Sequence, residues 1–251
     1  MKYISTSLFV FLTLMLTSSC SNDKPVVESF LNLKQQSIEN SYGVCDNEGA
    51  CGKINIEYPI FSGNNKEVDD LLNSEITKSI SSFYDTKTIE ETSKFFIRDF
   101  AEFVKDFPES ANNKWNVSMI YNVAKNTENI LSLSFAMEGY TGGAHGFSTI
   151  NYTNFNPKTG DKLNLKDIIS DMDKLRTIAR DIFIKGHNLD SNKSLNTQGY
   201  WFVDDIFSLN NNFIISSEGI TFHYNQYEIA PYSEGPIDIT IPMDKLEGLL
   251  K

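Results

Sequence analysis

The stretch Gly139-Tyr140-Thr141-Gly142-Gly143-Ala144-His145-Gly146 lies between two runs in which apolar and polar residues alternate, at residues 130–137 and 147–155. Alternation with a period of two is typical of half-buried strands. Glycine readily adopts positive φ, which a tight connection between strands requires. The stretch therefore predicts a turn between two antiparallel strands of a meander.

Residues upstream of this turn predict a hairpin followed by two helices. Residues 53–61 alternate as a strand, and an opening strand is expected within residues 25–37. Asn65 is suited to cap a helix with apolar residues at three- and four-residue spacing, and a second helix starts near Thr88. The phenylalanine stripe of that second helix is interpreted as core.

Residues downstream of the turn predict another mixture of helices and strands. Residues 156–160, Asn-Pro-Lys-Thr-Gly, predict a β-turn. The patterns that follow predict a helix at residues 171–185, a short helix at 200–206, and strands at 212–216, 220–224 and 237–241.

These patterns indicate an α+β fold in which amphipathic helices pack on an antiparallel meander sheet. Two intimately associated subdomains are expected. Residues 26–125 would form a hairpin-plus-helices subdomain, and residues 126–251 a C-terminal subdomain that contains the glycine-rich turn.

The N-terminus predicts export and a lipid anchor. Residues 1–19 contain Lys2 and a short apolar run, which is the pattern of a signal peptide. Small residues lead into Cys20, as in the lipobox of bacterial lipoproteins, so Cys20 is the expected lipidation site and residues 20–25 a polar stalk. An ordinary signal peptide that happens to contain a cysteine is the alternative. We expect a location in the bacterial cell envelope, facing the periplasm or the exterior.

Cys45 and Cys51 are the two remaining cysteines. In an oxidising compartment such a pair forms a disulfide by default. A loop this short contributes only about 2 kcal/mol on the chain-entropy model. We therefore expect the disulfide to close a hairpin tip, and we expect no metal site, because a zinc site needs a second pair of ligands.

The charge of the chain excludes one class of partner. Removal of residues 1–19 takes away Lys2 and leaves 33 acidic and 21 basic residues, a net charge of −12. Such a surface repels the phosphates of nucleic acid. It accelerates the encounter with a basic partner, although a solvated acidic surface with no partner is the alternative.

No complete catalytic constellation is present. The three histidines, His145, His187 and His223, lack metal-ligand spacing. The sequence contains no nucleophile elbow, phosphate-binding loop or dinucleotide fingerprint. We expect no catalytic residue and no cofactor, and we interpret the chain as a binding protein in preference to an enzyme.

Two segments resemble the C-terminal domain of RsiV-like proteins: residues 140–161 with Leu165, and the tail from Phe222 to Tyr232 with Gly235-Pro236. Residues 54–83 are similar to the small domain of unknown function that usually precedes it. The resemblance implies an exported α+β module, which occurs in membrane-bound anti-sigma factors that bind lysozyme and at the N-terminus of some cell-wall deacetylases. We expect neither sigma-factor control nor deacetylation here, because the sequence contains neither a sigma-binding segment nor a deacetylase domain.

The resemblance and the acidic charge lead to three functional hypotheses. The first is a lipid-anchored envelope protein that binds a basic cell-wall-active protein such as lysozyme. The second is a glycan-binding or hydrolytic domain centred on residues 139–146, and the third is a structural component of an envelope complex.

The candidate binding residues lie in the turn and in the tail. Glycines and exposed N–H groups of the turn can form an anion-binding concavity, and tyrosines of the tail can form a recognition surface. The alternatives are a purely structural turn and a tail that packs over the sheet. The candidates are Tyr140, Thr141, Gly142, Gly143, His145, Gly146, Tyr227, Glu228 and Tyr232.

Overall fold

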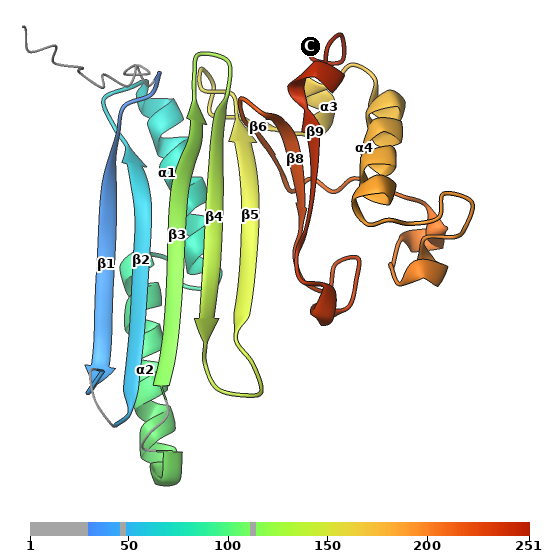
Figure 1. Cartoon of the computed structure of the whole chain (residues 1–251). Helices are drawn as coiled ribbons and strands as arrows, with labels where there is room; N and C mark the ends of the chain where they lie inside the picture. The colour runs from blue at the N-terminus through green and yellow to red at the C-terminus, as the bar shows by residue number, and fades with distance from the viewer. Residues whose placement is uncertain (1–29, 46–48, 111–113) are drawn as a thin grey trace, which may run out of the picture.

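The computed structural model describes residues 30–45, 49–110 and 114–251, and these residues form two sheets with helices (Figure 1). The larger sheet has the order β1-β2-β3-β4-β5-β6 and the smaller sheet the order β7-β8-β9. The α+β prediction is confirmed. The strands of the larger sheet are β1 Leu33–Gly43, β2 Cys51–Phe61, β3 Lys114–Asn126, β4 Leu131–Tyr140, β5 Phe147–Phe155 and β6 Lys162–Leu163.

Strands β1 and β2 form the expected antiparallel hairpin, and the Cys45–Cys51 disulfide lies at its tip. The next pairing differs from a simple meander, because β2 and β3 run parallel. Parallel neighbours require a long crossover, and here two helices provide it. From β3 to β5 the strands pair antiparallel in chain order, as the alternating patterns predicted.

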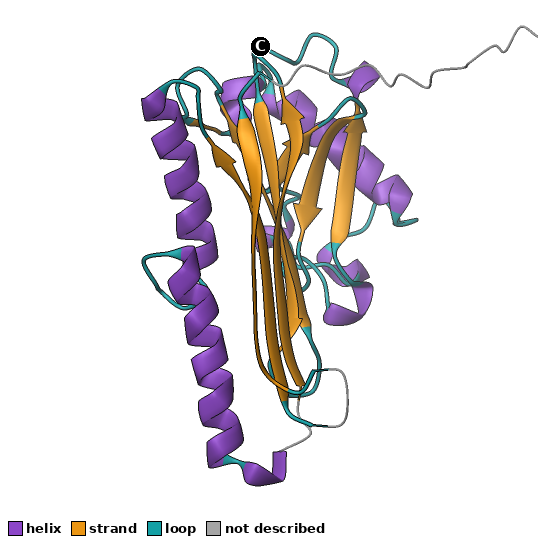
Figure 2. Cartoon of the chain, turned by 90° about the vertical axis from the view of Figure 1, so that its left-hand side faces the viewer, coloured by secondary structure: helices purple, strands orange, loops and turns teal. Residues whose placement is uncertain are grey.

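Helices α1 (Lys66–Ser81) and α2 (Ile89–Asp106) cover one face of the large sheet (Figure 2). Their N-caps are the predicted ones: the Asn65 side chain accepts from the N–H of Glu67, and the Thr88 hydroxyl accepts from the N–H of Glu91. One turn of 3-10 helix, Pro108–Ser110, follows α2.

The first core lies between these helices and the sheet. Phe96 and Phe100 are fully buried, which confirms that the phenylalanine stripe is core, whereas Phe107 at the end of α2 is exposed. Most of the other buried residues of this core come from β2, α1, β3 and β4, including Ile54, Ile56, Leu72, Ile76, Ile80, Val117, Met119, Leu131 and Leu133.

The second half of the chain builds a separate core around the small sheet. Its helices and strands are α3 Leu165–Ile168, α4 Met172–Gly186, β7 Phe213–Ile215, β8 Gly219–Tyr224 and β9 Ile237–Pro242. Short 3-10 turns lie at Asn196–Gln198, Val203–Asp205, Tyr232–Glu234 and Met243–Lys245. Helix α4 packs against β9, and Leu175, Phe183, Phe213, Phe222 and Ile241 fill the space between the helix and the small sheet.

One predicted helix is wrong. Residues 200–206 contain only the 3-10 turn at Val203–Asp205, because Asp204 and Asp205 adopt positive φ of 52° and 58°. Left-handed backbone cannot continue a right-handed helix. The subdomain boundary expected between residues 125 and 126 lies in β3, inside the large sheet, and it stays a prediction.

Asparagine side chains join the small sheet to the free edge of β5. Asn212 Oδ1 accepts from the N–H of Tyr152 at 2.7 Å, and its Nδ2 donates to the carbonyl of Ile150 at 2.8 Å. Asn225 Oδ1 accepts from the N–H of Ile150 at 2.7 Å. These amides make the hydrogen bonds that a neighbouring strand would otherwise make with this edge.

Asn154 makes the buried part of the same junction. Its Nδ2 donates to the carbonyl of Phe213 in β7 at 2.8 Å, and its Oδ1 accepts from the hydroxyl of Ser132 at 2.7 Å. Asn154 and Ser132 are both fully buried. Each polar atom in this contact is therefore satisfied by another part of the fold.

No helix within the described ranges combines the length and apolar character that a membrane crossing requires.

We predict that Asn154→Ala lowers the free energy of unfolding by about 2–4 kcal/mol, because the change leaves the Ser132 hydroxyl and the Phe213 carbonyl buried without partners. Urea denaturation measures the change. Asn129→Ala, on an exposed turn residue, is the control and should change stability by less than about 0.5 kcal/mol. Equal stability of the two variants would contradict the role of Asn154.

Candidate functional site

The glycine-rich turn projects from the ends of β4 and β5. Gly142 and Gly143 adopt positive φ of 97° and 94°. The Tyr140 hydroxyl donates to the carbonyl of Gly143 at 2.9 Å, and Nδ1 of His145 donates to the carbonyl of Gly146 at 2.7 Å. The turn is thus held by its own side chains, and the His145 ring stays exposed.

Two further glycines permit the close approach of the strands that leave the turn. A Cβ atom on Gly146 would lie 2.7 Å from the carbonyl oxygen of Gly139. A Cβ atom on Gly139 would lie 2.4 Å from the carbonyl oxygen of Asn116 in β3. Glycine at these positions has a structural reason, independent of any ligand.

The tail loop at residues 225–235 connects β8 to β9 and is fixed by polar contacts. Tyr227 adopts φ of 68°, which is uncommon for a residue with a side chain. The Glu228 carboxylate accepts from Asn225 Nδ2 at 3.2 Å and from Asn210 Nδ2 at 3.3 Å. Glu228 therefore shapes the loop as well as contributing charge.

The structure brings the turn and the tail together. The rings of His145 and Tyr232 stack with their centroids 4.7 Å apart, and Tyr232 lies 5.5 Å from the ring of Tyr227. Tyr227 is 56% exposed and Tyr232 37% exposed. Three of the predicted site residues thus form one row of accessible rings.

A groove of about 480 Å³ opens beside this row. It runs from the base of the glycine turn across β4, β3 and β2. Tyr140, Gly146 and Tyr232 are the predicted site residues that line it. The other lining residues are Lys53, Asn55, Asn116, Val117, Ser118, Glu138, Gly139, Phe147, Ser148 and Gln226.

The groove residues could not be selected from the sequence, because their signal is only the polar half of an alternating strand. In β2 and β3 the apolar positions point to the helices, so Asn55, Asn116 and Ser118 lie on the opposite face. Such positions are usually exposed to solvent. The pairing of strands, and the tail loop at one end, converts them into a groove.

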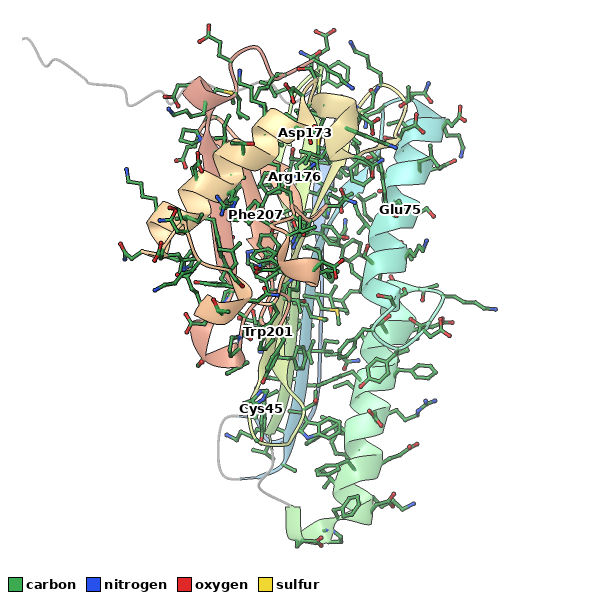
Figure 3. The ribbon with its side chains drawn as sticks, turned by 90° about the vertical axis from the view of Figure 1, so that its right-hand side faces the viewer. Cys45, Glu75, Asp173, Arg176, Trp201 and Phe207 are labelled. Carbon is green, nitrogen blue, oxygen red and sulfur yellow. A yellow bond between two sulfur atoms is a disulfide. The ribbon has the colours of Figure 1, made fainter. Side chains whose placement is uncertain are left out.

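A second exposed loop lies next to the tail. The N–H of Trp201 donates to the carbonyl of Ile229 at 2.9 Å, which fixes residues 200–206 beside residues 225–235. Trp201 is 48% exposed, Val203 80% and Ile206 62%. Figure 3 shows Trp201 on the layer that faces away from the helix carrying Glu75. We call residues 200–206 and 225–235 together the loop surface.

Acidic groups dominate the loop surface. It contains Asp204, Asp205, Glu228 and Glu234 and no lysine or arginine. The whole stretch 194–244 also lacks lysine and arginine, and its other acidic residues are Glu218, Asp238 and Asp244. Burial raises the pKa of Tyr200, and the charge of Glu234 raises it further. Burial also lowers the pKa of His187, while Glu234 opposes that shift. The field of Glu234 thus reaches both rings.

The three histidines do not form a site together. His145 stacks on Tyr232, His187 packs against Phe183, and His223 is buried with its Nδ1 2.7 Å from Asp238 Oδ1. Within the part of the chain that the structure describes, no group of three His, Cys, Asp or Glu side chains could hold a metal ion.

Two further predicted residues remain. Thr141 is half-buried in the turn, and Cys20 lies outside the described residues.

Two family models match the chain. Residues 155–244 match the model described as a protein of unknown function, DUF3298, and residues 45–148 match the model described as deacetylase PdaC. No functionally curated protein matches the sequence. The two matches cover the small-sheet half of the chain and most of the large sheet with its helices.

Two solved structures have a similar fold. A member of the DUF3298 family from Bacteroides fragilis has a TM-score of 0.66 and 23% identity, and the match covers 89% of this chain and 96% of the other. A DUF3298 family protein from Pseudomonas aeruginosa has a TM-score of 0.58 and 18% identity, with coverage of 88% and 95%. These similarities extend over both sheets.

We predict that Gly146→Ala lowers the free energy of unfolding by about 1–3 kcal/mol, because the new methyl group would collide with the Gly139 carbonyl. Gly186→Ala is the matched control. Its Cβ meets open space at the end of α4, and a change from zero to about 1 kcal/mol of stabilisation is expected. Thermal and urea unfolding of both variants test the difference, and an unaltered Gly146→Ala protein would contradict it.

Proposed function

We propose that this chain is a binding protein of the cell envelope that holds a basic protein partner. The matches to the two family models and to the DUF3298 structures support a DUF3298-type, RsiV-like family. The partner contacts the loop surface. A cell-wall-active protein such as lysozyme has the required charge, and lipid on Cys20 keeps the complex at the membrane.

The loop surface supports this proposal through its combination of charge and apolar area. The loop surface carries four acidic side chains, Asp204, Asp205, Glu228 and Glu234, and no lysine or arginine, so its field attracts a positive partner over long range. The exposed Trp201, Val203, Ile206 and Tyr227 supply the large side chains that dominate binding energy in protein interfaces. An acidic surface that only kept the protein soluble would not need such side chains.

Backbone strain in the same loops is a second supporting observation. Asp204, Asp205 and Tyr227 are three of the described non-glycine residues with positive φ. Strained positions persist where the surrounding structure enforces them, and they concentrate at binding sites. The contacts that enforce these backbone angles, such as Trp201 N–H to the Ile229 carbonyl and Asn225 to Glu228, hold the loops in one conformation, which reduces the entropy lost when a partner binds.

We predict that lysozyme binds the purified protein and that its affinity falls as salt increases from about 50 to 200 mM, since exposed charges are screened. Asp204→Asn and Glu234→Gln each weaken the complex by up to about fivefold, and Trp201→Ala weakens it at least about tenfold. Asparagine is chosen at position 204 because it tolerates positive φ. Calorimetric titration measures each affinity.

Glu102→Gln in α2 is the matched control, because it removes the same charge from the helix layer and should leave the affinity unchanged. Absence of heat and of co-elution at both salt concentrations would exclude lysozyme as the partner. An equal effect of Glu102→Gln and Glu234→Gln would exclude the loop surface as the binding site.

We further predict that Cys20→Ala moves the protein from the membrane to the soluble fraction of the producing bacterium, because the acyl chains anchor it. Mass spectrometry of the N-terminal peptide identifies the lipid directly. The Cys45→Ala/Cys51→Ala variant serves as control and keeps the anchor. An unmodified N-terminus that begins at Met1 would contradict both the anchor and the export of the protein.

A further inference from the structure

The groove on the helix-free face of the large sheet is chemically distinct from the loop surface. We propose that it binds a neutral oligosaccharide that carries acetamido groups. This site goes beyond the proposed capture of a basic protein, and it uses residues of β2, β3 and β5 that the loop surface does not contain. Its volume of about 480 Å³ is within the usual range of small-molecule sites, about 300–1,000 Å³.

The floor of the groove consists of strands inside the sheet. Strand β3 pairs with β2 on one side and with β4 on the other along the groove. Its backbone N–H and C=O groups are therefore already used in the two ladders. An extended peptide cannot add to this floor as a new strand, so a ligand must be recognised by side chains.

The side chains on the floor have unused hydrogen-bonding capacity. Asn116, Ser118, Ser148 and Gln226 make no side-chain hydrogen bond to any residue in the described ranges. The asparagines at the sheet junction behave differently, because Asn154 uses both polar atoms of its side chain within the fold. The amides and hydroxyls of the groove are thus available to the hydroxyl groups of a sugar.

Few charges line the groove. Lys53 and Glu138 are its charged lining residues, and Lys53 also forms an ion pair with Glu39 of β1 at 2.8 Å. In a chain with a formal net charge of −11, this composition selects neither a strongly cationic nor a strongly anionic ligand. A neutral ligand fits it best.

Aromatic rings form the end of the groove next to the glycine turn. Tyr140 and Tyr232 line it with their rings, and His145 stacks against Tyr232 and supports that ring. The ring of Phe147 lies on the helix side of the sheet, 6.3 Å from the ring of Phe83. Partly exposed rings beside amides offer an apolar face and hydrogen bonds together. A pyranose ring presents the complementary combination, with C–H groups on its faces and hydroxyls at its rim.

The amides indicate the substituent on the sugar. Asn55, Asn116 and Gln226 each present one carbonyl oxygen and one NH₂ group, although Asn55 also donates to Glu57 Oε1 at 2.9 Å. An acetamido group carries one N–H and one C=O and can pair with an amide side chain through both. Three amides in one groove therefore favour an N-acetylated sugar over its unsubstituted counterpart.

Titration of the full-length protein with the β-1,4-linked tetramer of N-acetylglucosamine, followed by NMR and calorimetry, tests the site. Cellotetraose, the β-1,4-linked tetramer of glucose, lacks acetamido groups and is the control ligand. We expect the side-chain amide signals of Asn116 and Gln226 to shift with the N-acetylated tetramer, and cellotetraose to bind more weakly. Asn116→Ala/Gln226→Ala should weaken binding roughly tenfold, since each amide contributes one or more hydrogen bonds.

Gln36→Ala is the control variant, because Gln36 is an exposed amide of β1 outside the groove. Absence of binding of either tetramer would overturn the proposal, and so would equal binding by the double variant and the wild type. Equal affinity for the two tetramers would contradict the acetamido preference. If a basic peptide shifts the groove signals and neither saccharide does, the ligand of the groove is a peptide and the saccharide proposal is wrong.

Discussion

The structure depends on how the free edge of β5 is satisfied. A strand edge exposes N–H and C=O groups, and in most sheets another strand pairs with them. Here the side-chain amides of Asn212 and Asn225 take that place at Ile150 and Tyr152, because an amide presents the same donor and acceptor as a peptide group. The contact covers a part of the β5 edge that β6 leaves unpaired, and it attaches the small sheet to the large one.

This junction also positions the accessible surfaces. Asn225 is the first residue of the tail loop, so the bond from Asn225 to β5 places the loop beside the glycine turn. Tyr232 then stacks on His145 and closes one end of the groove, while Trp201 follows through its bond to Ile229. One set of polar contacts thus determines both the loop surface and the groove.

The two surfaces differ in their chemistry although they share Gln226 and Tyr232. The loop surface is acidic, because it holds four carboxylates and no lysine or arginine, and it is apolar where Trp201, Val203 and Ile206 are exposed. The groove is lined by amides and hydroxyls with only two charged side chains, Lys53 and Glu138. A protein partner and a small polar ligand could therefore use neighbouring parts of one face, and each proposal can fail without the other.

The sequence by itself determined the local features of this protein: the N-caps Asn65 and Thr88, the strands on either side of the glycine turn, and the Cys45–Cys51 disulfide. These features depend on residues a few positions apart, which a pattern can reveal. Only the tertiary structure decided the parallel pairing of β2 with β3, the asparagine junction and the groove. These features arise from contacts between residues about 60 or more positions apart, such as Tyr152 with Asn212 and Asn55 with Ser118. A local sequence pattern cannot predict which distant residues come into contact.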